Sequence, residues 1–262
     1  MYNIVGAGLC GSMLAKEFDN LGIEYRIFDA KLPFSASIIS ENLFSDTWLK
    51  DVSYIKQSLD FIHDNYEVEK RLFVGPTTQK ELYHLPIPNV LRFDYIQEEV
   101  LEATKEGVRT HNGFYKGRNI ICAGFLAKKL FKLPYLDALT GHGFYIKKQV
   151  IKDYINTYRP YTHEKIMNWH DGLIWYGDST AIRHNNYMKK RKDYIQRSLE
   201  RLKGHGLEYE KIVYGSRPMN IKNPKEGLLV KINENNIIIN GGWKDGLVIY
   251  PYLIKKLHKW LK

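Results

Sequence analysis

The feature that most constrains the fold is a Gly-x-Gly-x-x-Gly pattern in residues 6–11. A short apolar run, residues 3–5, precedes it, and residues 12–21 follow with apolar side chains at helical spacing. Residues 24–29 alternate in the manner of a second strand. A strand, a glycine turn, a helix and a strand in this order predict a βαβ unit with a dinucleotide-binding turn.

Each glycine has its own physical role in such a turn. Gly6 permits the tight turn, Gly8 lets the backbone approach a pyrophosphate, and Gly11 allows the helix to pack closely on the strand. The N-terminus of the helix offers backbone N–H groups to the phosphates. Asp29 ends the second strand, where a carboxylate accepts hydrogen bonds from a ribose that carries no phosphate. The pattern therefore predicts binding of FAD or NAD, and the glycine spacing leaves that choice open.

Composition excludes several classes of protein. With 262 residues, 44% of them hydrophobic, the chain can form one large domain or a domain with an inserted partner. Two cysteines, Cys10 and Cys122, exclude a disulfide framework and a four-cysteine zinc site, and we expect both to be reduced. His163 and His170 lack the spacing of a metal-binding motif, so no metal site is predicted. No apolar run reaches the roughly 18 residues of a membrane span, and no leader is evident. We expect a soluble, cytoplasmic protein with no membrane contact.

Further helices and strands are predicted along the rest of the chain. Helices are expected at 52–65, 94–105, 187–203 and 247–261, and strands at 119–124, 173–177 and 237–239. Segments of nucleotide-binding type lie at both ends of the chain and in its middle. A second, strand-rich region, from about residue 139 to residue 214, must therefore be inserted rather than appended.

Six stretches match, in order, the motifs of a known family. They are residues 5–29, 35–43, 120–124, 177–180, 215–218 and 241–251. Together they resemble a compact member of the D-amino-acid oxidase/glycine oxidase superfamily of FAD-dependent oxidoreductases. The glycine turn is similar to the family's dinucleotide finger, and residues 35–43 resemble the small-residue loop that covers its cofactor.

The resemblance implies an α/β fold, in which a Rossmann-like FAD-binding domain is interrupted by a smaller, antiparallel β-rich substrate domain. The FAD-binding domain is expected to comprise residues 1–45, 90–138 and 212–262, and the substrate-binding region residues 46–89 and 139–211. FAD is expected to bind noncovalently, because no histidine or cysteine stands where relatives attach flavin. The residues assigned to the cofactor are Gly6, Ala7, Gly8, Leu9, Cys10, Gly11, Asp29, Ala30, Ser37, Ala123, Gly124, Gly242, Trp243, Lys244, Asp245, Gly246 and Leu247.

The resemblance also implies an activity. Members of the family oxidise an amine or amino acid by hydride transfer to flavin N5, and the resulting imine hydrolyses. Oxygen or another acceptor then reoxidises the flavin. Arg217 stands at the family's arginine position, where a planar guanidinium would hold a substrate carboxylate; the alternative is a structural salt bridge. Lys244 stands where relatives carry a basic residue near the flavin edge; the alternative is a solvated turn residue.

Charge raises a separate question about partners. The net charge of +10 suits anionic partners, and residues 189–203 are strongly basic, as a helix that grips nucleic-acid phosphates would be. Ile195, Leu199 and Leu202 give the same helix a core face, which favours an ordinary solvated basic face. Two alternative functions stay open: oxidative modification of a carboxymethylamino group on tRNA, and a degenerate FAD-binding protein without catalysis.

Overall fold

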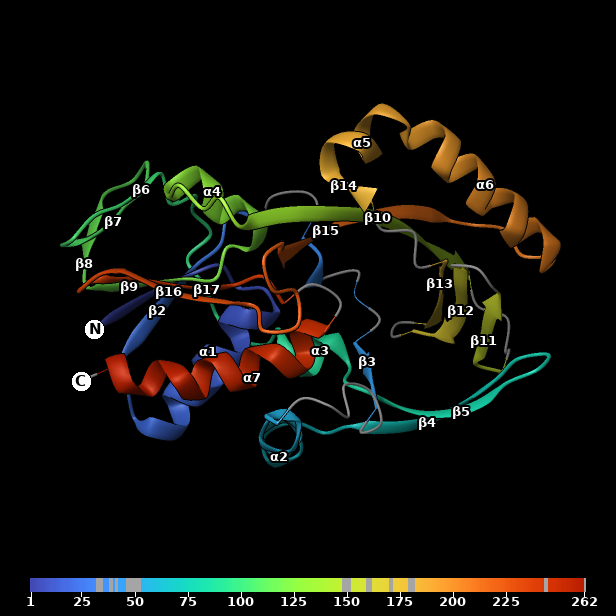
Figure 1. Ribbon diagram of the computed structural model, residues 1–262, viewed down its shortest axis with the longest axis horizontal. Helices are drawn as coiled ribbons and strands as arrows, with labels where there is room; N and C mark the ends of the chain where they lie inside the picture. Colours follow the sequence, from blue (N-terminus) through green and yellow to red (C-terminus); the bar gives the residue numbers. More distant parts are fainter. Residues whose placement is uncertain are drawn as a thin grey trace.

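Two large sheets lie one beyond the other along the long axis of the molecule, and smaller sheets and helices flank them (Figure 1). The computed structural model describes residues 1–31, 35–37, 40, 42–45, 53–147, 152–158, 162–169, 172–178, 182–242 and 245–261. Within these stretches, no helix is both long and apolar enough to cross a membrane.

The first large sheet has five strands in the order β16-β17-β9-β1-β2. Its four parallel strands are β1 (Tyr2–Val5), β2 (Tyr25–Phe28), β9 (Arg118–Ile121) and β17 (Asn236–Asn240). An antiparallel strand, β16 (Leu228–Asn233), completes it. The predicted strands in these regions, and with them the βαβ opening of the chain, are confirmed.

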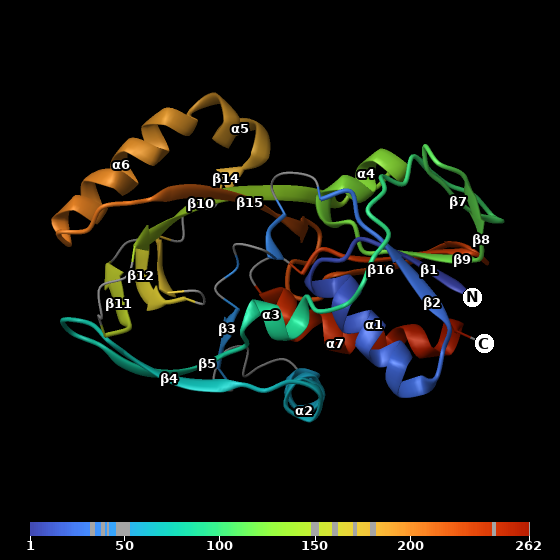
Figure 2. The ribbon, with the colours of Figure 1, turned by 180° about the vertical axis from the view of Figure 1, so that it is seen from behind.

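Helices α1 (Leu9–Leu21) and α7 (Gly246–Leu257) lie together on one face of this sheet (Figure 2). Ile4 and Ile120 are fully buried in the core that they form with these helices. Their neighbours Val5 and Ile121 are buried in a second core on the other face. Because both faces are covered, the strands are almost continuously apolar, as parallel strands in α/β folds are.

The second large sheet is antiparallel and has six strands. They are β10 (Leu136–Lys147), β11 (Tyr154–Tyr158), β12 (Thr162–Asn168), β13 (Leu173–Gly177), β14 (Ile182–Arg183) and β15 (Lys211–Asn220). Two helices, α5 (His184–Lys189) and α6 (Arg191–Gly204), cover its outer face (Figure 1). The predicted α/β fold with a second, antiparallel β-rich region is confirmed.

Smaller elements complete the molecule. A three-stranded sheet lies on the other side of the second large sheet from α5 and α6 (Figure 2). Its strands are β3 (Leu43–Phe44), β4 (Glu69–Val74) and β5 (Gln79–His84), with helices α2 (Ile55–Asn65) and α3 (Ile87–Val90) beside it. Another small sheet has strands β6 (Glu102–Ala103), β7 (Gly107–Arg109) and β8 (Phe114–Lys116). Short helices follow β9 at Gly124–Leu126 and Ala127–Leu130 (α4), and α7 at His258–Trp260.

A row of buried asparagines fastens the small β6-β7-β8 sheet to the first large sheet. Asn3, Asn119 and Asn236 occupy one register position on three neighbouring parallel strands. Asn3 donates to Asn119 at 2.8 Å, and Asn119 donates to Asn236 Oδ1 at 2.8 Å. Asn119 Nδ2 also lies 3.0 Å from the carbonyl of Thr104 and 3.1 Å from that of Gly107. These amides satisfy one another and the backbone where water is excluded.

The helix predicted at residues 94–105 is wrong. Ile96 instead forms a parallel bridge with Phe28 at the edge of β2, and Val100 is buried against the same core. The N–H of Ile96 donates to Ile27 at 2.8 Å, and the N–H of Asp29 donates to Ile96 at 3.0 Å. Pairing with the free backbone groups of this edge strand outweighs the helical spacing of the apolar residues.

The basic helix predicted at 187–203 is two helices that meet at Lys190. The break lets both pieces reach one buried histidine of β10. Tyr187 on α5 bonds to His142 Nδ1, and Ser198 on α6 bonds to His142 Nε2, each at 2.9 Å. Leu202 is buried against the sheet, and Ile195 and Leu199 pack on the same core. The predicted core face of the helix is confirmed.

Candidate functional site

Small residues gather at one edge of the first large sheet. The glycine finger follows β1, Ala123 and Gly124 follow β9, and Gly241 and Gly242 follow β17. These strands are parallel neighbours, so their carboxyl ends meet at the same edge. In open α/β sheets, ligands bind outside the carboxyl ends of the strands, where helices leave in opposite directions. The structure thus brings together three stretches that the sequence analysis assigned to a cofactor.

The glycine finger needs its first and third glycines for steric reasons. Gly6 has a φ of +108°, and a Cβ there would lie 2.6 Å from the carbonyl oxygen of Cys122. A Cβ on Gly11 would lie only 1.8 Å from the carbonyl oxygen of Gly6. Both neighbours are backbone atoms, which cannot move aside as a side chain can. The roles predicted for these two glycines, a tight turn and close helix packing, are confirmed.

Helix α1 begins in the middle of the glycine finger. Gly8 is the N-cap residue and supplies no side chain to cap the helix. The Leu9 N–H donates to Ser37 Oγ at 2.8 Å, and a Cβ on Gly8 would lie 2.9 Å from the same oxygen. The loop that carries Ser37 therefore lies directly against the helix N-terminus. Ser37 Oγ thus occupies one of the backbone N–H groups at the helix start, which are the groups that bind an anion.

Asp29 lies beside the finger, but in this structure its carboxylate binds backbone. Oδ2 accepts from the Ala7 N–H and Oδ1 from the Lys31 N–H, each at 2.7 Å. Each carboxylate oxygen can accept a second hydrogen bond, so ribose hydroxyls can still be bound. Asp29 thus also orders the turn, a role that the sequence analysis did not predict. Ala30 follows it and is half-buried.

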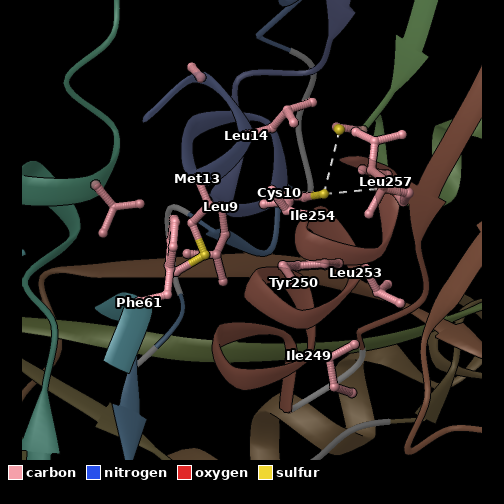
Figure 3. Packing of buried hydrophobic residues seen from close by; sticks show 14 of the residues in the cluster. Leu9, Cys10, Met13, Leu14, Phe61, Ile249, Tyr250, Leu253, Ile254 and Leu257 are labelled. Atoms are coloured by element: carbon pink, nitrogen blue, oxygen red, sulfur yellow. Dashed lines mark hydrogen bonds between the residues drawn. The ribbon is translucent and has the colours of Figure 1, made fainter. Parts of the chain in front are cut away.

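Beneath the finger, Cys10 belongs to the core (Figure 3). Its Sγ lies 3.4 Å from Cys122 Sγ, and both cysteines are free and buried. Burial raises the pKa of the Cys10 thiol, with a further contribution from Cys122, and so keeps the thiol neutral. Cys10 lies in the first turn of α1, so only its backbone, and not its buried thiol, faces the predicted cofactor site.

The third stretch at this edge is the turn between β17 and α7. A Cβ on Gly242 would lie 2.6 Å from Gly246 Cα and 2.8 Å from the Tyr250 ring, so both glycines serve close packing. The Asp245 N–H donates to the Gly242 carbonyl at 3.1 Å, and Leu247 is buried in the core. Trp243 and Lys244, also assigned to this site, lie outside the described residues. The Tyr250 ring packs against Gly242 and Gly246, a role that no spacing pattern in the sequence indicates.

Gly124 is fixed by its neighbour across the edge. Asn240, the last residue of β17, donates from Nδ2 to the Gly124 carbonyl at 2.6 Å. Gly124 itself has a φ of +57°, which favours glycine. The stretch after β9 is thus tied to the stretch after β17. Asn240 was missed by sequence reasoning, because a polar residue at a strand end carries no distinctive signal.

Strand β15 connects this edge to the second large sheet. Ser216 forms a bridge with Ser35, two residues before Ser37, and Met219 forms a bridge with Gly242. Arg217 lies between these two contacts and is half-buried. It pairs with Leu139 of β10, on the sheet face opposite α5 and α6. Arg217 is therefore one residue from the contact to Ser35 and two residues from the contact to Gly242.

The guanidinium of Arg217 has no hydrogen bond or ion pair with any residue in the described part of the chain. The alternative of a structural salt bridge therefore has no partner for Arg217 among the described residues. A guanidinium can bind an anionic group through two parallel N–H···O bonds.

The other face of the second sheet holds a polar network with a different role. Ser198 Oγ lies between His142 and Asp178, to whose carboxylate it donates. A nucleophilic triad needs the histidine between the serine and the acid, and all three side chains here are buried. Burial lowers the pKa of His142, against the opposing effect of the Asp178 carboxylate. The network therefore docks α5 and α6 on the sheet.

Comparison with solved structures supports the fold. A glycine oxidase from Bacillus cereus gives a TM-score of 0.71 at 15% identity, covering 99% of this chain and 96% of that one. An FAD-dependent oxidoreductase from Pseudomonas aeruginosa gives 0.70 at 13%, covering 99% and 89%. An amino acid oxidase essential for nikkomycin biosynthesis gives 0.72 at 11%, covering 99% and 93%. By sequence, the chain matches no protein-family model and no curated protein. The predicted α/β fold with its antiparallel β-rich region is confirmed, and it is the fold of these solved oxidases and of the FAD-dependent oxidoreductase.

Proposed function

We propose that this protein is an FAD-dependent oxidoreductase that oxidises an amine or amino acid. The observation that carries the proposal is the position of Arg217. It lies on β15 between a contact to the loop over the glycine finger and a contact to Gly242. A carboxylate bound there would hold its substrate beside the edge at which the cofactor segments meet. The solved structures with this fold include a glycine oxidase and other oxidases, which supports the general class of activity.

The described residues fit FAD. The finger presents a helix start whose N-cap residue, Gly8, has no side chain, and Ser37 Oγ occupies the Leu9 N–H beside it, where a pyrophosphate would bind. Asp29 follows β2 with carboxylate lone pairs still available for a ribose. An acid at this position favours a ribose without a phosphate, and the turn after β17 is of the flavin type by resemblance. By the resemblance, no histidine or cysteine stands where relatives attach flavin, so we propose noncovalent binding.

When bound, FAD would supply the hydride acceptor, and the protein would orient the substrate. Arg217 would hold the substrate carboxylate through two parallel N–H···O bonds, which fix the direction of the neighbouring carbon and its amine. Oxidation of the amine gives an imine, which water hydrolyses. On the resemblance alone, we propose Lys244 as a second site residue, placing a positive charge near the flavin.

The visible spectrum of the purified protein tests the proposal. We expect a yellow protein that releases free FAD, and no NAD, on acid precipitation. Anaerobic titration with matched pairs of amines, with and without a carboxylate, should bleach the flavin, with the carboxylate member reacting at lower concentration. A colourless protein that cannot be reconstituted with FAD would refute the assignment. Bound FAD that no amine reduces would favour the degenerate flavoprotein.

A further inference from the structure

A stretch without side chains lies beside Arg217 on the face of the second large sheet opposite α5 and α6, here called the inner face. In the ladder of β10 and β15, Arg217 pairs with Leu139, and two positions further along Gly215 pairs with Gly141. Residues two apart on a strand point to the same face, so Gly143 is the next inner-face residue of β10. At these positions next to Arg217, the inner face is therefore formed by backbone alone.

The indole of Trp175 lies over the far end of this stretch. Trp175 of β13 pairs with Tyr145 of β10, and its ring leans from there toward the Arg217 end of the sheet. A Cβ on Gly143 would lie 3.1 Å from Trp175 Nε1, and a Cβ on Gly177 would lie 1.9 Å from Trp175 Cη2. The ring can lie on the sheet in this way because both positions are glycine. The four residues of the stretch, here called the glycine floor, are Gly141, Gly143, Gly177 and Gly215.

The indole N–H of Trp175 has no hydrogen-bond partner in the part of the chain that the structure describes. The residue is 3% exposed, and Nε1 itself is buried, so water does not replace the missing partner. A buried donor without an acceptor lowers stability, and for that reason nearly all such groups in proteins are paired. Phenylalanine would place a ring here without that cost. An acceptor that enters from outside the chain, on the side of the ring over Gly143, would give the N–H a function.

The surroundings of Trp175 favour an acceptor without charge. The ring belongs to an apolar core that includes Phe73 and Met167. Moving a charged group from water to such a place costs far more than moving an amide or a carbonyl. Leu139 and Gly143, which mark the two ends of the stretch on β10, are four residues apart, or about 14 Å at the rise of a strand. An amino acid that binds the guanidinium through its carboxylate fits within this length, with its side chain directed at the indole.

We infer that Trp175 is a specificity-determining residue, which selects an amino acid whose side chain carries an uncharged hydrogen-bond acceptor such as a carbonyl. Arg217 binds the carboxylate, the side chain lies over the glycine floor, and Trp175 Nε1 donates to the acceptor at its end. This inference rests on the proposed function, which names the reaction but leaves the side chain of the substrate open. Trp175 takes no part in the oxidation itself. An apolar side chain of the same length would leave the N–H unpaired and would bind more weakly.

Oxidation of glutamine and of norleucine, each supplied as both enantiomers, compares a carbonyl acceptor with an apolar side chain of similar length. In Trp175→Phe, the ratio of kcat/KM for glutamine to kcat/KM for norleucine should fall about tenfold, the loss expected for one hydrogen bond. The matched control Trp169→Phe makes the same change in a neighbouring indole, whose ring centroid lies 6.3 Å from that of Trp175, and should keep the wild-type ratio. An unchanged ratio in Trp175→Phe, or equal changes in both variants, would overturn the proposal.

Nuclear magnetic resonance of the indole groups tests the contact without reference to turnover. In the protein prepared with isotope-labelled tryptophan, the indole signal that is missing from Trp175→Phe belongs to Trp175. Its N–H proton should shift downfield when glutamine is added anaerobically and should stay in place with norleucine. A signal that moves with neither amino acid, or equally with both, would overturn the proposal even if the variant folds poorly. Because this signal reports binding, a protein that binds glutamine but reduces no flavin would refute the proposed function separately.

Discussion

Gly8→Ala tests the candidate site, because this substitution should weaken cofactor binding while it leaves the protein folded. Its φ of −71° and ψ of −172° are extended backbone that alanine adopts freely. An added Cβ would meet Ser37 Oγ at 2.9 Å, and moving this hydroxyl would weaken its bond from the Leu9 N–H. That loss costs about 1 kcal/mol. Alanine in place of glycine stabilises the folded state by about 0.4–1 kcal/mol, because it lowers the conformational entropy of the unfolded chain. The free energy of unfolding should therefore change by less than about 1 kcal/mol.

Binding of FAD should respond very differently to the same methyl group. In the proposed site the added methyl group would lie where the backbone approaches the pyrophosphate, and each charge-assisted hydrogen bond lost there would cost about 1.5–3 kcal/mol. The affinity for FAD should then fall about tenfold to 150-fold for each bond. The assay is a titration of apoprotein with FAD, followed by flavin fluorescence, with urea unfolding measured in parallel.

The control for this substitution is Gly204→Ala at the end of α6, where an added Cβ meets no atom within 4 Å. It should change neither FAD affinity nor, by more than about 1 kcal/mol, stability. If Gly8→Ala binds FAD as tightly as wild type and folds normally, the glycine finger is not the pyrophosphate site, and the reasoning fails.

Three other substitutions examine separate parts of the argument. Arg217→Lys should cost about 2–5 kcal/mol in kcat/KM for amines with a carboxylate and little for simple amines; equal losses for both would remove the anchor role. Asn119→Leu leaves its two neighbouring amides short of partners and should lower the free energy of unfolding by about 2–6 kcal/mol in urea, whereas exposed Asn185→Leu should shift it by less than about 0.5 kcal/mol. Because burial lowers the pKa of folded His142, the unfolded state binds its proton first, so stability falls as pH drops below about 6.5. His142→Gln should flatten that decline by up to about 1.4 kcal/mol per pH unit; an unchanged profile would contradict the assignment.

Local signals were sufficient for the part of the fold that is built from neighbouring residues. The glycine finger with its flanking strands and α1 follows from a pattern within residues 3–29, where turn, helix and strand are all encoded in sequence order. Gly22, directly after Leu21, ends α1 in the left-handed region that favours glycine. Such features are predictable because the interactions that fix them lie within a few residues.

Features set by distant pairing could not be predicted in the same way. Residues 94–105 have helical apolar spacing, yet the free edge of β2 pairs with Ile96 and holds the segment extended. The row of Asn3, Asn119 and Asn236 joins strands more than one hundred residues apart, and no single asparagine differs from a loop residue in sequence. Asp29 was predicted as a ribose acceptor, whereas its bond to Ala7 within the finger depends on how β1 and β2 align.

Arg217 could be assigned to the site only through the family resemblance, because local sequence periodicity does not predict which face of the sheet it occupies. β15 pairs with β10 at ten consecutive positions, so the register of one long ladder decides which face Arg217 occupies. A slip of one residue would turn it from the inner face to the face that α5 and α6 cover. The same register sets Ser216 against Ser35 and Met219 against Gly242. The partner strand lies more than 70 residues earlier in the chain, so nothing near Arg217 in the sequence indicates its face. The candidate substrate anchor and its contacts to the cofactor segments therefore depend on a single pairing, and a change that shifts β15 should disturb both together.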